Sequence, residues 1–532
     1  MPSPPKVYRG SVRKLMLGID VGTTFSGVSY AVLDPGEELS IHGITRYPGQ
    51  ENYPSNSKIP SILYYRQDGT LHSAGAEAKA PGMDIVAEDE NLLLVEWFKL
   101  HLRPESLGAA AISSEDLPPL PPRKTVVDIF ADFLRYLFEC ARRYISENHV
   151  SGESLLNSVK DRIEFVLSHP NGWEGLQQRK MRRAAVIAGL VPDTAAGHSR
   201  IHFVTEGEAS LNFCINNKLA AQDMESVIIV DAGGGTIDIS SYLFLSISPM
   251  SVEEAAPPDC ILQGSTRVNV RLQEFLKGHL ASSPFANEDD IKSMLNHFDE
   301  SAKLVFKDER ESSYIKFGSM KDNDPAVNIR HGQLMLSGSD MVTFFKPAIQ
   351  SISNAIQTQR DGASSALSTA FFVGGFAANP WLYSSLKKKL EARGVVVYRP
   401  DSPNKAVADG AVSFYLDHFV SSRVTKVTYG TKICVKYHPD DPEHFARRYQ
   451  KFIRPSGSVN LPNGFSTILR KGTRVRDKEE ISHSFYQEAR ESRTLNSISC
   501  DIICYKGPDT PAWVDIDPGQ YILLNVTKFK QY

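Results

Sequence analysis

The segment Gly18-Ile19-Asp20-Val21-Gly22-Thr23-Thr24-Phe25-Ser26-Gly27 decides the fold, because an apolar run from Leu15 ends there in an aspartate followed by a glycine and threonine turn. The apolar run resumes from Gly27 to Leu33, which predicts a β-hairpin. Glycine lets the backbone approach a ligand closely, and successive N–H groups with threonine hydroxyls can bind phosphate oxygens. Asp20, at the strand end, is placed to hold a metal-bound water. Taken alone, the turn is equally typical of a structural Asp-capped turn.

A second segment repeats this pattern in Val227-Ile228-Ile229-Val230-Asp231-Ala232-Gly233-Gly234-Gly235-Thr236-Ile237-Asp238. Two such hairpins are what a cleft needs if it holds the phosphates of a nucleotide from both sides. Three consecutive glycines would weaken a sheet that was only structural. Asp231 and Asp238 would then provide further carboxylates for magnesium and for the attacking water.

A third segment, residues 370–380 (AFFVGGFAANP), is again an apolar strand that opens into glycines, and a helix is expected over residues 381–393. Here Gly374 and Gly375 would let an adenine and a ribose approach the backbone. Taken alone, a junction of strand, two glycines and helix more often reflects close packing.

The residues around these motifs predict an α/β protein. Apolar residues recur at helical spacing over residues 126–145 and 177–189, and short apolar runs at 163–168 and 201–204 predict buried strands of a mixed sheet. Such alternation of helices and strands is typical of the α/β class.

Two regions depart from that alternation. Residues 103–124, with the cluster Pro118-Pro119-Leu120-Pro121-Pro122, predict an extended, exposed loop that is more typical of a spacer than of a peptide ligand. Beyond about residue 422, β-branched and aromatic segments at 424–437, 481–485 and 521–526 predict a separate β-rich region.

The composition excludes several classes of partner. The 532 residues are 41% hydrophobic and 23% charged, and the formal charge of −3 leaves no basic excess for nucleic acid or anionic lipid. No stretch approaches the roughly 18 to 20 apolar residues that span a bilayer. We therefore expect a cytoplasmic or nuclear protein with no nucleic-acid partner and no membrane span.

The three motifs, in this order and spacing, resemble the actin-like ATPase superfamily, which includes actin, sugar kinases and the seventy-kilodalton heat-shock chaperones. The match covers residues 15–419. The chaperones are the most similar, because Gly75-Ala76-Glu77-Ala78-Lys79 follows Ile59-Pro60-Ser61 at their distance. Only about 110 residues follow the match, which is similar to the atypical heat-shock 70 kDa protein 12 kind.

The resemblance implies a two-lobed nucleotide-binding domain of duplicated ribonuclease H-like lobes over residues 15–422. A flexible tail (1–14) would precede it, and a β-rich, substrate-binding-like region (423–532) would follow. It also implies ATP hydrolysis to ADP and phosphate, coupled to lobe closure on a protein client, with ATP or ADP and Mg²⁺ as cofactors. A co-chaperone or a nucleotide-exchange partner would act on such a cycle.

The resemblance also assigns the residues of the site. The catalytic set would be Lys79, Glu206, Asp231 and Asp20, with Mg²⁺ held largely through water by Asp20, Asp231 and Asp238. The ATP contacts would come from Gly22, Thr23, Thr24, Phe25, Gly233, Gly234, Gly235, Thr236, Gly264, Glu300, Lys303, Gly374, Gly375 and Phe376.

Two departures from the family leave alternatives open. The arginines that sandwich the adenine in the family are replaced by Ala378 and Leu304, so nucleotide affinity should fall while phosphate chemistry stays possible. A nucleotide-gated scaffold with negligible turnover is therefore a second hypothesis. A small-molecule kinase of the same fold is a third, which Lys79 and the β-rich tail disfavour.

Overall fold

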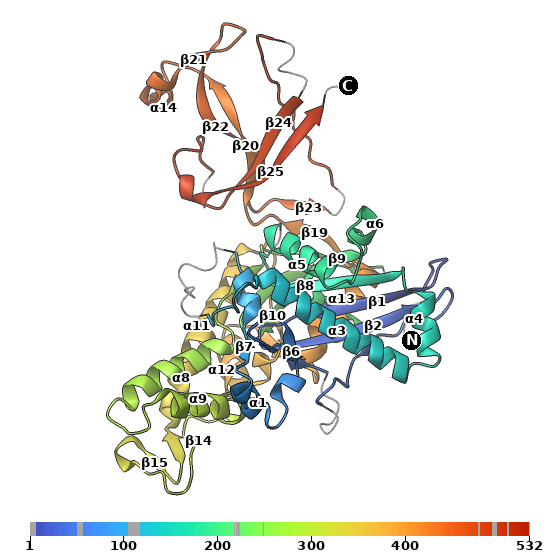
Figure 1. Cartoon of the computed structure of the whole chain (residues 1–532). Coiled ribbons are helices and arrows are strands. Elements are labelled where there is room, and N and C mark those ends of the chain that lie inside the picture. Colours follow the sequence, from blue (N-terminus) through green and yellow to red (C-terminus); the bar gives the residue numbers. More distant parts are fainter. Residues whose placement is uncertain are drawn as a thin grey trace. The chain divides into compact units, whose positions relative to one another are not determined.

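The computed structural model describes residues 7–50, 57–104, 117–173, 175–217, 219, 224–247, 249–476, 479–491, 497–507 and 510–530 (Figure 1). The chain divides into two compact units, one of Met1–Ser251 with Pro258–Phe419 and one of Val252–Pro257 with Val420–Tyr532. The division therefore falls at residue 419, and the predicted boundary at 422 lies inside strand β19 (Val420–Val424).

The first sheet of the larger unit is built around the hairpin that the sequence predicts. Its order is β3-β2-β1-β8-β9, with β4 on β2. The strands are β1 (Lys14–Asp20), β2 (Phe25–Leu33), β3 (His42–Gly43), β4 (Ile59–Pro60), β8 (Ile163–His169) and β9 (Ile201–Thr205). Strand β1 pairs antiparallel with β2, from Lys14 opposite Leu33 to Asp20 opposite Gly27, and parallel with β8. The predicted hairpin and buried strands are confirmed.

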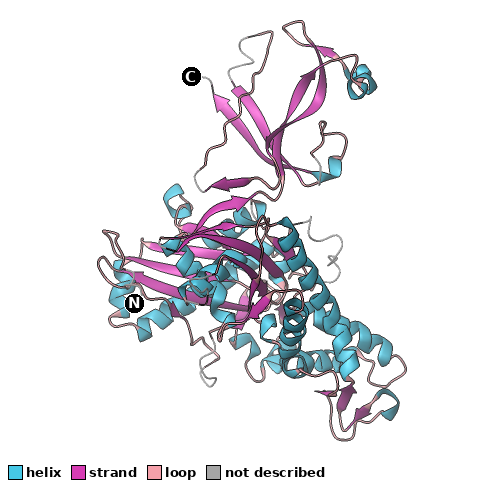
Figure 2. Ribbon diagram, turned by 180° about the vertical axis from the view of Figure 1, so that it is seen from behind, coloured by secondary structure: helices cyan, strands magenta, loops and turns pink. Residues whose placement is uncertain are grey.

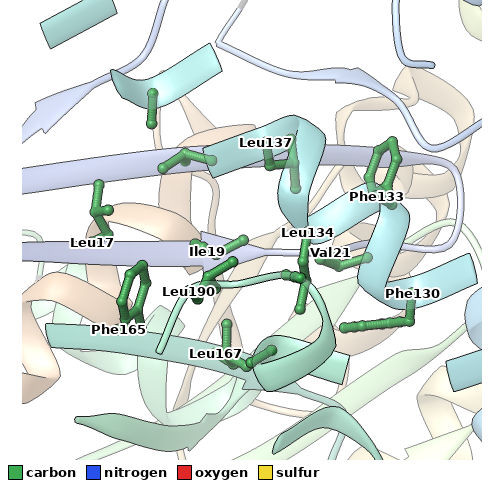
Figure 3. Packing of buried hydrophobic residues seen from close by; sticks show 14 of the residues in the cluster. Leu17, Ile19, Val21, Phe130, Phe133, Leu134, Leu137, Phe165, Leu167 and Leu190 are labelled. Atoms are coloured by element: carbon green, nitrogen blue, oxygen red, sulfur yellow. The ribbon is translucent and has the colours of Figure 1, made fainter. Parts of the chain in front are cut away.

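The side chains of β1 alternate between two buried faces. Leu17 and Ile19 belong to one buried apolar cluster with Phe133 and Leu137 of α3 (Val126–Asn148), and Figure 3 shows members of this cluster from both elements. Met16 lies in a second apolar cluster with residues of α13 (Ala406–Asp417). Because a strand has a period of two, helices can cover both faces of the sheet, which explains why β1 carries no polar side chain between Leu15 and Ile19.

A second sheet repeats the arrangement of the first. Within the larger unit its strands follow the order β18-β17-β10-β11, with β13 on β11. They are β10 (Ser226–Ala232), β11 (Ile237–Ile247), β13 (Asp259–Ile261), β17 (Thr369–Val373) and β18 (Val396–Tyr398). Strand β10 pairs antiparallel with β11 and parallel with β17, as β1 does with β2 and β8. In both sheets the aspartate-bearing strand is therefore central and buried.

Helices cover these sheets, and local capping explains where several begin. Thr125 and Asp128 form a capping box at the start of α3, and Ser337 and Asp340 form another at α11. The other helices of this unit are α1 (Met83–Asp89), α4 (Gly152–Ser158), α5 (Leu176–Ile187), α6 (Ala195–His198), α7 (Glu206–Asn216), α8 (Thr266–His279), α9 (Glu288–His297), α10 (Lys303–Val305), α11 (Gly338–Gly362) and α12 (Pro380–Glu391). The helices predicted over 126–145, 177–189 and 381–393 are confirmed.

Two small sheets and the proline-rich segment complete the larger unit. The sheets are β6-β5-β7, of Leu71–Ala74, Leu63–Tyr65 and Leu93–Val95, and β14-β16-β15, of Ser313–Lys316, Gln333–Leu336 and Ile329–Arg330. Most of the predicted proline-rich loop, residues 105–116, lies outside the described residues. Its C-terminal part is not uniformly exposed, because Leu117 is buried beside Leu100 and Leu262.

The smaller unit consists mainly of strands, as Figure 2 shows. One sheet has the order β21-β22-β20-β24-β25, of Phe452–Ile453, Val459–Leu469, Thr428–Lys436, Ser497–Tyr505 and Tyr521–Lys530. Strand β19 pairs with β12 (Met250–Glu254) and with β23 (Arg474–Arg476). Among the described residues, the one α-helix of this unit is α14 (Pro442–Ala446). The segment 481–485, predicted to extend the β-rich texture, forms no strand.

The segment 252–257 belongs to the smaller unit although the chain on both sides of it belongs to the larger one. Val252 pairs with Val420 in a parallel register, and the backbone N–H of Val424 donates to the buried carboxylate of Glu254 at 2.7 Å. Glu253 forms an ion pair with Arg474 at 2.9 Å. The smaller unit is thus completed by a strand that comes from the interior of the sequence.

Val7 and Tyr8 make backbone contacts with the segment that follows β2. Val7 forms a β-bridge with Glu38, and the N–H of Tyr8 donates to the carbonyl of Glu37 at 2.9 Å. The first strand begins at Lys14, within the stretch predicted as a flexible tail. Among the described helices, none combines the length and the apolar character that a membrane crossing requires.

Candidate functional site

The first glycine turn is fixed by contacts that admit no side chain at Gly22. A Cβ at this position would lie 2.2 Å from the carbonyl oxygen of Phe25. The N–H of Gly22 donates to Ser26 Oγ at 3.1 Å, and Ser26 shares a hydrogen bond with Ser61. Thr23 is buried, whereas the side chain of Phe25 is about half exposed. The turn is therefore a tight backbone loop that the hydroxyl groups of Ser26 and Ser61 stabilise.

The second glycine turn lies directly against the first. The N–H of Gly233 donates to the carbonyl of Thr236 at 3.0 Å, which closes the turn. A Cβ at Gly234 would lie 2.2 Å from Thr24 Oγ1, and one at Gly235 would lie 2.4 Å from Thr23 Oγ1. The two predicted phosphate-binding turns thus meet, although they come from different sheets.

Two further glycine segments join this pair of turns. Gly374 has φ +89°, and a Cβ there would lie 2.4 Å from Asp231 Oδ1, so only glycine fits. A Cβ at Gly264 would lie 2.4 Å from the carbonyl oxygen of Gly234. The N–H groups of Ser265 and Thr266 donate to the carbonyls of Gly233 and Gly234, which fixes the second turn.

Four buried carboxylates lie around these turns: Asp20, Glu206, Asp231 and Asp238. Asp20 Oδ1 accepts a hydrogen bond from Ser168 at 2.9 Å, and Asp231 accepts one from Ser210 at 3.1 Å. Asp238 Oδ1 accepts from the N–H of Asn171 at 2.5 Å. Its other oxygen, Oδ2, is buried without a hydrogen-bond partner among the described residues.

Two lysines compensate part of this charge. Lys58 Nζ lies 2.5 Å from Asp20 Oδ2, and Lys99 Nζ lies 2.5 Å from Glu206 Oε1. Neither lysine was predicted from the sequence. A lysine inside the apolar run Trp97-Phe98-Lys99-Leu100 is unusual enough to have been a signal, because a buried lysine requires a charged partner.

The surroundings divide the carboxylates by their proton affinity. Burial, reinforced by the charges of Glu206 and Asp20, raises the pKa of Asp231 to about 7. Burial and the charge of Glu206 also raise the pKa of Asp238 well above its ordinary value. Burial alone would raise the pKa of Asp20 too, but the ammonium groups of Lys58 and Lys99 hold it below its ordinary value. Asp20 is thus ionised near neutral pH, whereas Asp231 and Asp238 bind their protons more tightly than an ordinary aspartate.

This division predicts a pH-dependent stability. The folded chain binds the protons of Asp231 and Asp238 more tightly than the unfolded chain, in which the pKa of aspartate is about 3.9. The free energy of unfolding of the nucleotide-free protein should therefore fall as the pH rises from about 4 to about 7, by up to about 1.4 kcal/mol per pH unit for each group. Urea unfolding at a series of pH values measures the slope. Asp231→Asn should flatten it, and an unchanged slope in that variant would contradict the assignment.

Lys79, the lysine predicted for catalysis, forms an ion pair with another predicted site residue. Lys79 ends the 3₁₀ helix Glu77–Lys79 and pairs with Glu300 at 2.7 Å, and the side chains are 49% and 59% exposed. Both residues were predicted to contact the nucleotide. The two side chains pair with each other, and the hydrogen bonds and ion pairs of the described residues connect neither of them to the carboxylate cluster.

The residues predicted for the base and the ribose form a second group. Lys303 is buried and donates to Asp299 and to Asn269, and Asn379 Nδ2 donates to the carbonyl of Lys303 at 2.7 Å. This last bond connects the third motif to the helix of the predicted ribose lysine. Phe376 is buried with its ring centroid 6.1 Å from that of Phe345, so it packs in the interior. A stacking role on adenine does not follow from this position.

The carboxylates are not arranged as a direct metal centre. Among the described residues, no three histidine, cysteine, aspartate or glutamate side chains converge closely enough to ligate an ion. The chemistry of the site nevertheless fits a hydrated Mg²⁺, because buried carboxylates and the unpartnered Asp238 Oδ2 can accept hydrogen bonds from its water ligands. The prediction of magnesium held through water thus stays a prediction.

Comparison with known proteins identifies distant homologues over most of the chain. Heat shock 70 kDa protein 12A of Mus musculus is 24% identical over 84% of this chain and 78% of its own length. Heat shock 70 kDa protein 12B of Homo sapiens is 22% identical over 84% of this chain and 77% of its own. No family model matches the sequence. These homologues confirm the resemblance that the three glycine motifs predict, and the mixed α/β sheets are consistent with an actin-like fold.

Proposed function

We propose that this homologue of the heat shock 70 kDa protein 12 proteins binds ATP with magnesium between two ribonuclease H-like lobes and hydrolyses it to ADP and phosphate. The observation that carries the proposal is the meeting of the two turns, with Gly234 against Thr24 and Gly235 against Thr23. Each turn follows a strand that ends at a buried aspartate. Phosphoryl transfer requires mainly positioning and charge compensation, which such a site supplies.

The chemical step is a displacement at the γ-phosphorus. A water oxygen forms a bond to phosphorus, the bond from phosphorus to the β–γ bridging oxygen breaks, and its electron pair leaves with ADP. The water loses a proton. Asp231, with a pKa of about 7, is suited to accept that proton at neutral pH. Bound magnesium would neutralise charge on the phosphates, and Asp20, Asp231 and Asp238 would hold its water ligands.

The biological output would be a change in the smaller unit that alters its grip on a protein client. This part of the proposal draws on the homologues, which are named heat shock proteins. Measuring the affinity for Mg-ATP and Mg-ADP together with single-turnover hydrolysis of the whole purified chain tests the proposal. Absence of binding at millimolar nucleotide would overturn it.

A nucleotide-gated scaffold with negligible turnover is favoured by one specific observation. Leu304 is 54% exposed, and Ala378 is also exposed. Neither side chain carries a cation, so neither can make the contact with adenine that the family's arginines make. Nucleotide binding without single-turnover hydrolysis would select this alternative over an ATPase. Phosphorylation of a small molecule at the cost of ATP would instead select the kinase.

Restoring both arginines should tighten nucleotide binding. Because residues 304 and 378 are exposed, the double variant Leu304→Arg with Ala378→Arg can place two guanidinium groups beside a bound base. We expect a gain of about 0.5 to 2 kcal/mol in the free energy of ADP binding, as cation–π contacts contribute. Calorimetric titration of ADP measures it. Arginine at Leu245, an exposed leucine of β11, is the control, and an equal gain there would point to nonspecific charge attraction.

A further inference from the structure

Lys99 is the most deeply buried cation of the carboxylate cluster. Its side chain is 3% exposed, it pairs with Glu206 at 2.5 Å, and Nζ lies 6.0 Å from the centroid of the Trp173 ring. Burial alone would lower the pKa of Lys99, but the charges of Glu206 and Asp20 raise it above its ordinary value. The ammonium group is therefore charged at neutral pH and surrounded by the groups proposed to serve the reaction.

The residue next to Lys99 in the sequence, Leu100, lies against the second phosphate-binding turn. Lys99 belongs to the 3₁₀ helix Phe98–Leu102, which follows Trp97 with its φ of +53°. A Cβ at Gly235 would lie 2.9 Å from Leu100 Cδ2, as well as 2.4 Å from Thr23 Oγ1. The residue next to Lys99 therefore touches the second turn at the point where that turn meets the first.

Stability alone does not explain a charged pair in this position. Replacing a buried ion pair with apolar residues of similar volume is often neutral or stabilising, because two charges must leave water to form the pair. A pair placed beside three further carboxylates, one of which has an unpartnered oxygen, fits instead a site that a polar ligand and its accompanying cation complete. Lys79, exposed and paired with Glu300, has no such setting.

We infer that Lys99, rather than Lys79, supplies the ammonium group that compensates charge on the transferring phosphoryl group, and that Glu206 holds Lys99 in place until ATP binds. This inference rests on the proposed ATPase function. Lys99 stays protonated throughout: the water oxygen bonds to the γ-phosphorus, ADP leaves with the bridging oxygen, and Lys99 transfers no proton. Its contribution is electrostatic, and a preorganised charge in a water-excluded site is effective for that purpose.

Single-turnover hydrolysis and ADP affinity, measured together, test the inference. Because ADP lacks the γ-phosphate, Lys99→Met should lower the hydrolysis rate at least tenfold while changing Mg-ADP affinity less than threefold. Removing Lys99 leaves Glu206 buried without its partner. Lys99→Met is therefore also introduced into the Glu206→Gln variant, and this double variant is compared with Glu206→Gln alone. Lys124→Met, which removes a lysine paired with Asp132 at 2.8 Å outside the cluster, is the matched control.

The outcomes separate this inference from the proposed function. No nucleotide binding by the wild-type chain would overturn both. Wild-type hydrolysis with less than a threefold loss at Lys99, or a larger loss in Lys79→Met than in Lys99→Met, would overturn the assignment of Lys99 alone. If the methionine variants do not fold, Lys99→Arg tests the electrostatic role of Lys99, because it keeps the positive charge. Its rate should then stay above one-tenth of the wild-type rate, and complete loss would contradict a purely electrostatic role.

Discussion

Replacing Asp231 with asparagine should lower single-turnover ATP hydrolysis by roughly 100-fold or more, the scale of loss when a preorganised charged group is removed from a site. Asparagine keeps the size of the side chain and can still accept the hydrogen bond from Ser210. What it removes is the group that can take a proton or hold a water of magnesium. Rapid-quench measurement of one turnover, with nucleotide affinity determined in parallel, gives the effect on the chemical step.

The matched control for this variant is Asp409→Asn. Asp409 is a carboxylate of α13 that accepts a hydrogen bond from Ser29 on β2. Burial raises its pKa, as it does for Asp231. Asp20→Asn should also reduce hydrolysis, although it breaks the ion pair with Lys58 and so affects folding as well. Unchanged turnover in both Asp20→Asn and Asp231→Asn would refute the site.

Gly234→Ala should weaken the binding of Mg-ADP by about 100-fold or more. A Cβ at Gly234 would lie 2.2 Å from Thr24 Oγ1 and 2.9 Å from Thr24 Cβ, so rotation of the threonine side chain cannot relieve the overlap. The two turns must then separate, and displacement of about 1 Å in such a site can cost on the order of 100-fold in activity. Equilibrium titration with a fluorescent ADP analogue measures the loss.

Two neighbouring substitutions serve as controls for Gly234→Ala. A Cβ at Gly233 would lie 3.2 Å from the carbonyl oxygen of Thr236, a much smaller overlap in the same turn. A Cβ at Gly278, on helix α8, would meet no atom within 4 Å. We expect affinity to decrease in the order Gly278→Ala, Gly233→Ala and Gly234→Ala. Equal affinities across the series would mean that nucleotide binding does not depend on the meeting of the two turns.

The hairpins could be predicted from the sequence because their signals are local. An apolar strand that ends in aspartate and glycine specifies its own turn, and the helices over 126–145 and 381–393 have continuous apolar spacing. The repetition of this pattern also predicts that Asp20 and Asp231 share one site. Their shared burial and their different pKa values depend on neighbours distant in sequence, such as Lys58 and Glu206, and could not be predicted in this way.

Lys99 shows that spacing along the sequence does not determine which lysine contacts the carboxylate cluster. Lys79 lies at the chaperones' spacing from the first motif, but the direction of a side chain depends on how the chain turns after that motif. Gly82 and Trp97 both have positive φ, and between them the chain forms α1 and β7 before Lys99 enters the cluster. Phe376 is similar, since an aromatic residue after two glycines can face a ligand or the interior with the same local sequence.

The origin of strand β12 from inside the larger unit has a consequence during translation. The hydrogen bond from Ser421 to Val252 can form only after 169 further residues have been synthesised. At a synthesis rate of about 5 to 20 residues per second, this delay is roughly 10 to 30 s. During that interval Glu253 and Glu254 lack Arg474 and Val424, the partners that they have in the finished fold. The edge of β12 that pairs with β19 therefore stays without that partner until the last quarter of the protein is synthesised.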